Sequence, residues 1–314
     1  FMKILLIFTY IIIYYNSNIM SIFDCFMYFD EDMLLDIRLN ILDRYVKKFI
    51  IVESNFLHSG KKKKLNFNIN NFKKFKDKII YISVDELPSS LSNYDENDDI
   101  FLKNKKILDN SVIRENYQRN FIRKGLERIS EDDLILLSDL DEIPNLENFS
   151  HNKKISFFEQ NVFYYKFNLM QPNFKWVGTR ACKKKHLISP QWLRNIKNRI
   201  YPFWRLDVFF SKKKYSDINL VKNGGWHFTS IKKPEDIFFK FSNYLHHLEF
   251  EKSKINIQEV EKLIQNKKII YDHNVKQEGN KFNASNNLIT VDDKYLPKYL
   301  IENKNKFMNW FDQT

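Results

Sequence analysis

The segment "DLILLSDLDEIP", Asp133 to Pro144, decides the fold because it joins a buried strand to a group of carboxylates. Its four apolar residues, 134–137, form a short continuous run that is typical of a fully buried strand. Asp139, Asp141 and Glu142 follow directly. Carboxylates this close together repel one another and are costly to bury, so they need cations or water around them.

Buried strands and amphipathic helices alternate on the N-terminal side of this segment. We expect strands at 21–29, 48–54, 78–84 and 134–137, and helices at 30–45, 70–78 and 110–129. This order predicts an α/β fold with a mostly parallel central sheet flanked by helices. Ligands of such folds bind at the carboxyl ends of the strands, where the three carboxylates lie.

Beyond Pro144 the pattern changes. Residues 157–170 alternate as in antiparallel strands, and the aromatic and glycine-containing segments "FKWVGTR" (174–180) and "NGGWHFTS" (223–230) are expected to be loops that shape a pocket. Helices are expected at 233–250 and 257–269, and a polar loop at 277–287. Since no linker or repeat interrupts the chain, residues 20–314 are expected to form one domain with C-terminal helices.

The first nineteen residues contain an apolar run. Their apolar run, 4–15, is shorter than the roughly twenty residues of a membrane span, and no small-residue cleavage site follows it. We expect residues 1–19 to be an apolar leader or an extension outside the folded domain, with Met20 as a possible natural start.

The composition of the chain indicates which classes of binding partner to expect. The net charge of +12 favours anionic partners such as nucleotides, phosphoglycans or an acidic membrane surface. The lysine runs lack the interleaved aromatics of single-strand binders, so no nucleic acid is expected. Cys25 and Cys182 are too few for a disulfide framework or a zinc cluster and are expected to be buried free thiols. We expect a cytoplasmic location, with peripheral membrane contact as an option.

The spacing of Asp139 and Asp141 suits a metal site. If the strand geometry continues, both side chains point to one face, where they suit Mn²⁺ or Mg²⁺ together with water and substrate phosphate. Such a metal stabilises a departing nucleotide diphosphate. A phosphohydrolase of the haloacid dehalogenase type also uses DxD at a strand end. There, however, the motif follows the first strand, whereas here it follows at least three and continues as "EIP".

Six segments in order resemble glycosyltransferase family 17, the family of the eukaryotic enzyme that adds bisecting N-acetylglucosamine to N-glycans. They are "IFDCFMYFDEDMLLDIRLNIL", "KFIIVESNFLHSGKKKKLNF", "RENYQRNFIRKGL", "LILLSDLDEIP", "KWVGTR" and "NGGWHFTS". The resemblance implies a fold like the GT-A nucleotide-diphospho-sugar transferases. It also implies inverting, metal-dependent transfer of N-acetylglucosamine from its UDP conjugate to a glycan or glycolipid. The family's usual Asn-Glu is Asp30-Glu31 here, and "HHLE" (246–249) replaces a segment like "SHQE".

The resemblance also implies roles for individual residues. Asp139 and Asp141 match the family's DxD, and Glu142 matches the acidic residue after it. Asp141 is the expected direct metal ligand, and Asp139 binds the ribose, or the metal through water. His227 completes the metal shell or packs as a hydrogen-bonded core residue.

The remaining candidates concern the donor and the proton transfer. Expected donor-binding residues are Glu53, Arg114, Gln118, Asp139, Trp176 and Trp226. Each of these has a structural alternative. Arg114 and Gln118 could form surface pairs on their helix, as expected for Glu115 and Arg119. Glu53 could belong to a simple turn or cap a helix, and the two tryptophans could pack in the core.

An inverting transfer needs a general base, for which Glu249, Asp236, Glu235 and Asp207 are candidates, with Glu249 preferred. Two other functions stay open: the DxD phosphohydrolase and a non-catalytic glycan-binding module on a decayed transferase fold.

Overall fold

The computed structural model describes residues 20–95, 97–202, 204–243, 247–272, 281–282 and 286–313. The expected leader, 1–19, and much of the expected polar loop, 277–280 and 283–285, lie outside the described residues. Within them, ten strands form one sheet, with eight in the order β3-β2-β1-β4-β7-β6-β9-β5, while β10 pairs with β7 and β8 with β6.

Strands and helices alternate in the first half of the chain, as predicted. The elements are β1 (Ile22–Met27), α2 (Asp32–Leu42), β2 (Lys48–Ser54), η1 (Ile69–Lys78), β3 (Ile79–Val84), α3 (Ile100–Asn120), α4 (Ile122–Gly125), β4 (Leu134–Leu137) and β5 (Glu142–Pro144). The long helix α3 begins ten residues before the expected residue 110. Its start is fixed by Asp99, whose side chain accepts a hydrogen bond from the Leu102 N–H at 2.7 Å.

The second half contains the longest strands and the C-terminal helices. The elements are β6 (Ile155–Tyr164), β7 (Leu169–Lys183), η2 (Lys184–His186), α5 (Pro190–Asn195), α6 (Leu206–Phe209), β8 (Ile218–Val221), β9 (Gly225–Thr229), α7 (Pro234–Asn243), α8 (His247–Ser253), α9 (Ile257–Gln265), β10 (Ile289–Thr290), η3 (Asp293–Tyr295), α10 (Lys298–Glu302) and η4 (Lys304–Trp310). The helix expected at 233–250 corresponds to α7 and α8; residues 244–246 lie outside the described part.

Strand β4 separates two apolar cores. Leu134 and Leu136 belong to the core that α2 covers, and Ile135 and Leu137 belong to the core that α4 covers. This alternation follows from the two-residue period of a strand. Because both faces are covered, the strand is apolar throughout and its burial is complete. The two cysteines are buried and free, as expected.

The expectation of a mostly parallel sheet is wrong, because the sheet is mixed. Strands β1, β2, β3 and β4 pair in parallel as predicted. The long strand β7, however, runs antiparallel to both β4 and β6. The chain returns from β6 to β7 without a helix between them, so the two neighbouring strands run in opposite directions. The result is a mixed α/β fold with a curled central sheet and helices around it; the GT-A likeness stays a prediction.

Two segments expected to be loops are strands. "KWVGTR" lies inside β7, and "GWHFT" is β9. Their glycines serve close approach: a β-carbon at Gly178 would lie 2.7 Å from Glu142 Cδ, and one at Gly225 would lie 2.1 Å from the Ile143 carbonyl oxygen. Glycine inside a strand can mark such close contact as well as a turn.

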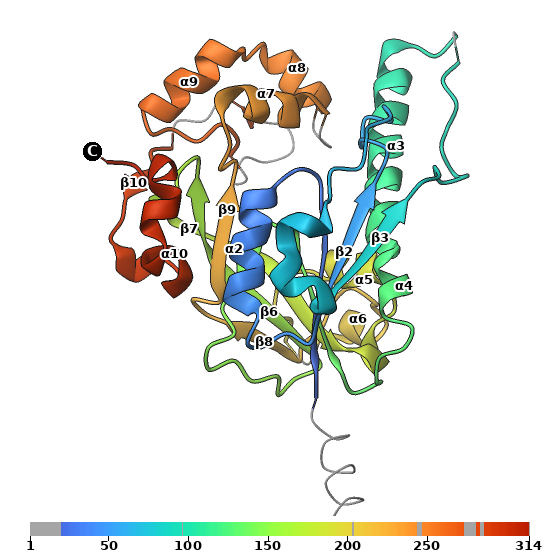
Figure 1. Ribbon diagram of the computed structural model, residues 1–314. Helices are drawn as coiled ribbons and strands as arrows, with labels where there is room; N and C mark the ends of the chain where they lie inside the picture. Colours follow the sequence, from blue (N-terminus) through green and yellow to red (C-terminus); the bar gives the residue numbers. More distant parts are fainter. Residues whose placement is uncertain are drawn as a thin grey trace, which may run out of the picture.

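Figure 1 shows α7, α8 and α9 together at one end of the molecule, the end toward which the arrows of β2 and β3 point. The carboxyl ends of these strands therefore open toward α7. Among the described residues, no helix has the length and apolar character needed to cross a membrane.

Candidate active site

The carboxylates lie on a tight turn between β4 and β5, residues 138–142, which we call the acidic turn. The Glu142 N–H donates to the Asp139 carbonyl at 3.1 Å, and the Asp139 N–H donates to the Glu142 carboxylate at 2.9 Å. The strand geometry thus ends at Leu137, contrary to the assumption behind a shared strand face. The turn nevertheless brings Asp139 and Asp141 to the walls of the same two pockets.

Arg38 of α2 holds the acidic turn from inside the protein. Its guanidinium binds both carboxylate oxygens of Asp24 in β1, at 2.8 and 2.6 Å, and both side chains are fully buried. The remaining terminal nitrogen donates to the carbonyl oxygens of Asp139, Leu140 and Glu142 at 3.1, 3.0 and 2.9 Å. One buried cation therefore fixes the path of the backbone under the carboxylates.

Two further arginines neutralise Asp139 and Glu142 from the pocket side. Arg194 of α5 lies 2.7 Å from one Asp139 oxygen and 2.8 Å from both Glu142 oxygens. Arg119 of α3 lies 3.2 Å from the other Asp139 oxygen and 2.6 Å from Glu115. Burial alone would raise the pKa of Asp139, but the two guanidinium groups outweigh it and lower that pKa.

Asp141 has looser partners. Its oxygens lie 3.7 Å from His227 Nε2 in β9 and 3.7 Å from the Lys240 ammonium in α7. Burial would raise the pKa of Asp141, yet these neighbours lower it well below its usual range. Burial would likewise lower the pKa of Lys240, but Asp141 and Glu31 raise it. Asp141 is therefore ionised, and its ion-pair partners in the described structure are more distant than those of Asp139.

Three adjoining pockets lie at this site, and residues of the acidic turn line two of them. The apolar pocket is lined by Met27, Tyr28, Phe29, Glu31, Ser54, Phe56, Leu57, His58, Lys63, Gln118, Asp139, Leu140, Asp141, Lys240 and Asn243. The central pocket is lined by Glu115, Asp139, Asp141, Glu142, Tyr164, Trp176, Arg194, His227, Thr229, Ser230, Lys240, Phe241 and Tyr271. The arginine pocket is lined by Val112, Glu115, Asn116, Arg119, Trp176, Val177, Arg180, Gln191, Arg194, Asn195, Ile196, Lys197 and Asn198. Shared residues place the central pocket between the other two.

Besides the DxD pair, two predicted donor-binding residues, Gln118 and Trp176, and the predicted metal ligand His227 line these pockets. Gln118 lines the apolar pocket and donates to the Val52 carbonyl at 3.1 Å. Trp176 separates the central and arginine pockets, and its indole N–H donates to Glu142 at 2.6 Å. His227 lines the central pocket, with its ring centroid 5.6 Å from that of Trp176.

Three other predicted donor-site residues lie outside the walls of these pockets. Glu53 is fully buried and accepts hydrogen bonds from the Asn66 and Phe67 N–H groups and from the Tyr81 hydroxyl. It anchors the segment after β2 that carries Lys63.

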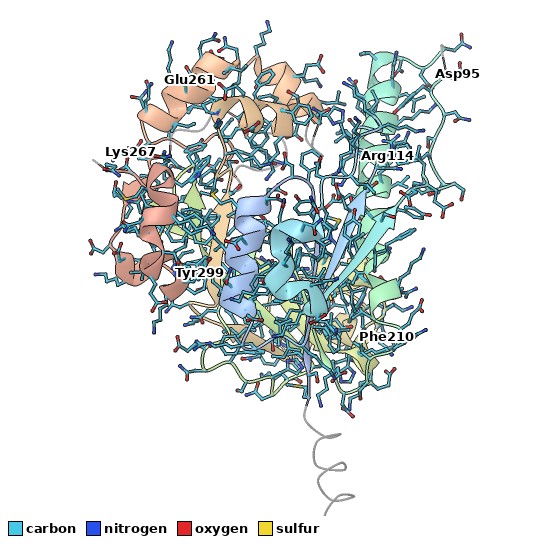
Figure 2. The ribbon with its side chains drawn as sticks, viewed as in Figure 1. Asp95, Arg114, Phe210, Glu261, Lys267 and Tyr299 are labelled. Atoms are coloured by element: carbon cyan, nitrogen blue, oxygen red, sulfur yellow. The ribbon has the colours of Figure 1, made fainter. Side chains whose placement is uncertain are left out.

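Arg114, labelled on α3 in Figure 2, donates to the His58 carbonyl at 3.0 Å and packs on Gly60 in the same segment. The indole of Trp226 bonds to the Tyr295 carbonyl at 2.7 Å. Glu53 and Arg114 therefore hold the segment after β2, and Trp226 contacts the segment around Tyr295.

The predicted general bases are spread over three elements. Asp207 is exposed on α6 and paired with Arg205 and Lys214. Glu235 and Asp236 are exposed in the first turn of α7. Glu249 of α8 is partly buried, and its charge, after burial, helps to raise the pKa of Tyr271, which lines the central pocket. Glu249 is thus the candidate with an electrostatic connection to the site.

Sequence reasoning missed the cations. The pair Glu115–Arg119, expected on a surface, lies in the centre of the site with Arg119 almost fully buried. The i,i+4 spacing on α3 could have pointed to it. Lys240 lies on the same helix as the candidate Asp236, one turn further on. Nothing in the local sequence marks Arg38 or Arg194, since their partners lie far away along the chain.

The residues present fit a divalent cation only in part. In the described ranges, no group of three or more His, Cys, Asp and Glu side chains is arranged to hold a metal ion. Both Asp139 oxygens already face guanidinium groups. Asp141 and His227 remain as two donors, and the buried His227 Nδ1 has no hydrogen-bond partner in the described structure. Mg²⁺ commonly binds through one or two protein ligands plus substrate phosphates and water.

An acidic turn that faces buried guanidinium groups thus lies at the carboxyl end of a parallel strand, where α/β folds commonly bind their ligands. The chain belongs to glycosyltransferase family 17, because the sequence model of that family matches residues 14–311 of its 314 residues. The resemblance seen in the sequence is confirmed. A comparison with curated protein sequences gave no match. The family supports a glycosyltransferase over a phosphohydrolase, with a sugar donor and an acceptor as partners in general terms.

Proposed function

We propose that the protein is an inverting glycosyltransferase that transfers N-acetylglucosamine from its UDP conjugate to a hydroxyl group of a glycan or glycolipid. One observation carries the proposal. The acidic turn stands between an apolar pocket and a polar one, so a single ligand that fills both must pass the carboxylates and Lys240. A nucleotide-sugar has this order of parts: an aromatic base, a charged diphosphate and a sugar.

The donor fits this row of pockets. The uracil lies in the apolar pocket beside Phe29 and Phe56, where Gln118 offers a polar edge. The diphosphate lies at Asp141 and Lys240. The sugar enters the central pocket against the face of Trp176, since indole rings stack well on the apolar faces of sugars.

The balance of charges supports a metal. Asp139 is paired with Arg119 and Arg194, and Glu142 with Arg194, whereas the Lys240 ammonium stays 3.7 Å from Asp141. A diphosphate adds further negative charge, which a divalent cation offsets. Asp141 and His227 would hold Mn²⁺ or Mg²⁺, which supplies neutralisation of the departing diphosphate.

Inversion requires a base on the acceptor side of the sugar. We assign this role to Glu249, next to Tyr271. Glu115 is a weaker choice because Arg119 binds it at 2.6 Å and helps to hold its pKa below the usual range, against the opposing effect of burial. Replacement of Glu249 by Gln should lower kcat/KM and abolish its rise to a plateau at high pH. Glu115→Gln should keep this pH dependence and mainly loosen the hydrogen bonding of Arg119. A pH profile of Glu249→Gln like that of the wild type would remove Glu249 from this role.

The first test is calorimetric titration with UDP-N-acetylglucosamine, with and without Mn²⁺. The wild type should bind with Mn²⁺, and Asp141→Ala should lose this metal-dependent binding. Asp109→Ala, which removes an exposed carboxylate on α3, serves as the control and should behave as the wild type. Absence of wild-type binding would contradict the donor. Release of UDP by the wild type in the presence of a glycan mixture distinguishes the transferase from a binding module, and release of phosphate from a monoester would favour a phosphohydrolase.

A further inference from the structure

The arginine pocket contains a buried cation, Arg180, that forms no ion pair with a carboxylate in the described part of the chain. Arg180 of β7 is 8% exposed, and its hydrogen bond goes to the Leu193 carbonyl at 3.0 Å. Its Nε is buried without a hydrogen-bond partner, and no salt bridge to Arg180 occurs among the described residues. Its guanidinium also lies 5.2 Å from the Phe157 ring centre. A buried charge without an ion pair is costly, so its presence calls for a partner from outside the protein.

The surroundings of Arg180 strengthen this conclusion. Burial and the nearby Arg194 lower the pKa of Arg180 to about 9, because Glu142 compensates only in part. The arginine pocket also contains Lys197, which is exposed and has no salt bridge in the described structure. Arg119 and Arg194, by contrast, are each bound to two carboxylates. The unmatched positive charge therefore lies at Arg180 and Lys197.

The location assigns this charge to the acceptor side. The apolar pocket and the arginine pocket share no lining residue, and the central pocket lies between them. A donor that extends from the apolar to the central pocket leaves the arginine pocket free. That pocket has a volume of about 510 Å³ and side-chain amides from Asn116, Gln191, Asn195 and Asn198, which suit sugar hydroxyls.

We propose that the arginine pocket binds an acidic glycan acceptor, with a carboxylate or phosphate group of that glycan held by Arg180 and assisted by Lys197. Guanidinium groups bind both anions in a two-pronged manner. This inference rests on the proposed function, since it names the acceptor class of the same site. It makes the acceptor an acidic saccharide whose charged group lies beyond the sugar unit that reacts.

The test uses two matched probes at low ionic strength, where screening is weak. They are a trimer of galacturonic acid and its carboxyl-reduced neutral form, and binding is measured by calorimetry with the full chain. The wild type should bind the acidic trimer at least about tenfold more tightly, the usual effect of one good charge-assisted interaction. Arg180→Gln should remove this preference, and Lys197→Gln should reduce it. Arg44→Gln, which removes an exposed charge after α2, should preserve it.

Several outcomes would overturn the proposal. Equal binding of the two trimers by the wild type would do so, and so would an unchanged preference in Arg180→Gln. If Arg180→Gln does not fold, an unchanged preference in Lys197→Gln would count against it. Binding of inorganic phosphate without any preference between the trimers would reduce the pocket to a site for a free anion.

Donor titration separates this inference from the proposed function. Arg180→Gln should still bind UDP-N-acetylglucosamine. A wild type that prefers the acidic trimer but does not bind the donor would contradict the donor assignment alone. A wild type that binds the donor but shows no preference would contradict the acidic acceptor alone.

Discussion

The two sides of the acidic turn are neutralised in different ways. On the inner side, Arg38 and Asp24 are fully buried and the Arg38 guanidinium binds carbonyl oxygens of the turn. On the pocket side, Arg194 is partly exposed, and the ion-pair partners of Asp141 among the described residues lie at 3.7 Å. The inner side is complete without a ligand, whereas the pocket side keeps bonding capacity. The difference indicates that the inner cation fixes the shape of the turn and leaves the pocket side as the side on which we propose that the substrate binds.

The largest expected effect comes from breaking the inner side. Arg38→Met leaves the Asp24 carboxylate buried without a partner and removes donors from the carbonyl oxygens of the turn. Removal of one member of a buried ion pair costs about 3–5 kcal/mol. We expect the free energy of unfolding, measured with urea, to fall by that amount.

The control for Arg38→Met is Arg44→Met, which removes an exposed arginine near the end of the same helix and should leave stability almost unchanged. The double variant Arg38→Met/Asp24→Asn should recover part of the loss, because it no longer buries an unpaired charge. If Arg38→Met is as stable as the wild type, the conclusion that the inner cation fixes the acidic turn is wrong.

Breaking the pocket side should cost less. Arg194→Gln removes the hydrogen bonds to Asp139 and Glu142, but the guanidinium is partly exposed, so we expect a loss of about 2–3 kcal/mol. Arg194→Lys keeps the positive charge but loses the two-pronged hydrogen bonding of the guanidinium. Its stability should lie between those of the wild type and Arg194→Gln. Urea unfolding measures both, with exposed Arg199→Gln as the control. A loss as large as that of Arg38→Met would mean that the two sides are equivalent.

A methyl group added at Gly178 tests how closely β7 packs against Glu142 of the acidic turn. In Gly178→Ala the new β-carbon would lie 2.3 Å from Gln160 Oε1 and 2.7 Å from Glu142 Cδ, so Glu142 must move. Overpacking of this kind costs about 1–3 kcal/mol. Donor affinity should also fall, because Glu142 positions both Trp176 and Arg194. Unchanged stability together with unchanged donor binding would show that the turn tolerates displacement.

The smallest effect is a pH dependence at Asp141. Its pKa is lowered in the folded protein, so its ionisation stabilises the fold above the unfolded pKa of about 3.9, and this contribution is lost as the pH falls toward the folded value. The difference in thermal midpoint between wild type and Asp141→Asn should stay constant between about pH 5 and 8. It should shrink below about pH 4, where Asp141 becomes protonated in the unfolded protein. Asp109→Asn should show no such change. A difference that already shrinks near pH 6 would assign the titration to another group.

The sequence was sufficient where the fold depends on local pattern. The apolar runs of β1, β2, β3 and β4 and the helix between β1 and β2 are marked by periodicity, and the acidic turn follows a strand end as predicted. These features depend on neighbours in the chain, which a single sequence displays. The metal-binding chemistry expected from the spacing of Asp139 and Asp141 stays a prediction, whereas the family resemblance is confirmed.

The sequence was insufficient where the fold depends on distant pairing. The direction of β7 is set by β4 and β6, and no local pattern fixes it. Arg38 and Arg194 meet the acidic turn from positions about a hundred residues before it and fifty after it. Glycine in "KWVGTR" was expected to mark a loop, but it permits the approach of Glu142 in three dimensions.

The buried pair of Arg38 and Asp24 has a consequence for the interpretation of mutational scans. Neither residue lines any of the three pockets, yet each determines the backbone on which the metal and donor candidates stand. A scan that scores activity alone would place positions 24 and 38 beside Asp141 in importance. A parallel measurement of the amount of folded protein would distinguish residues that contact the substrate from residues that only position them.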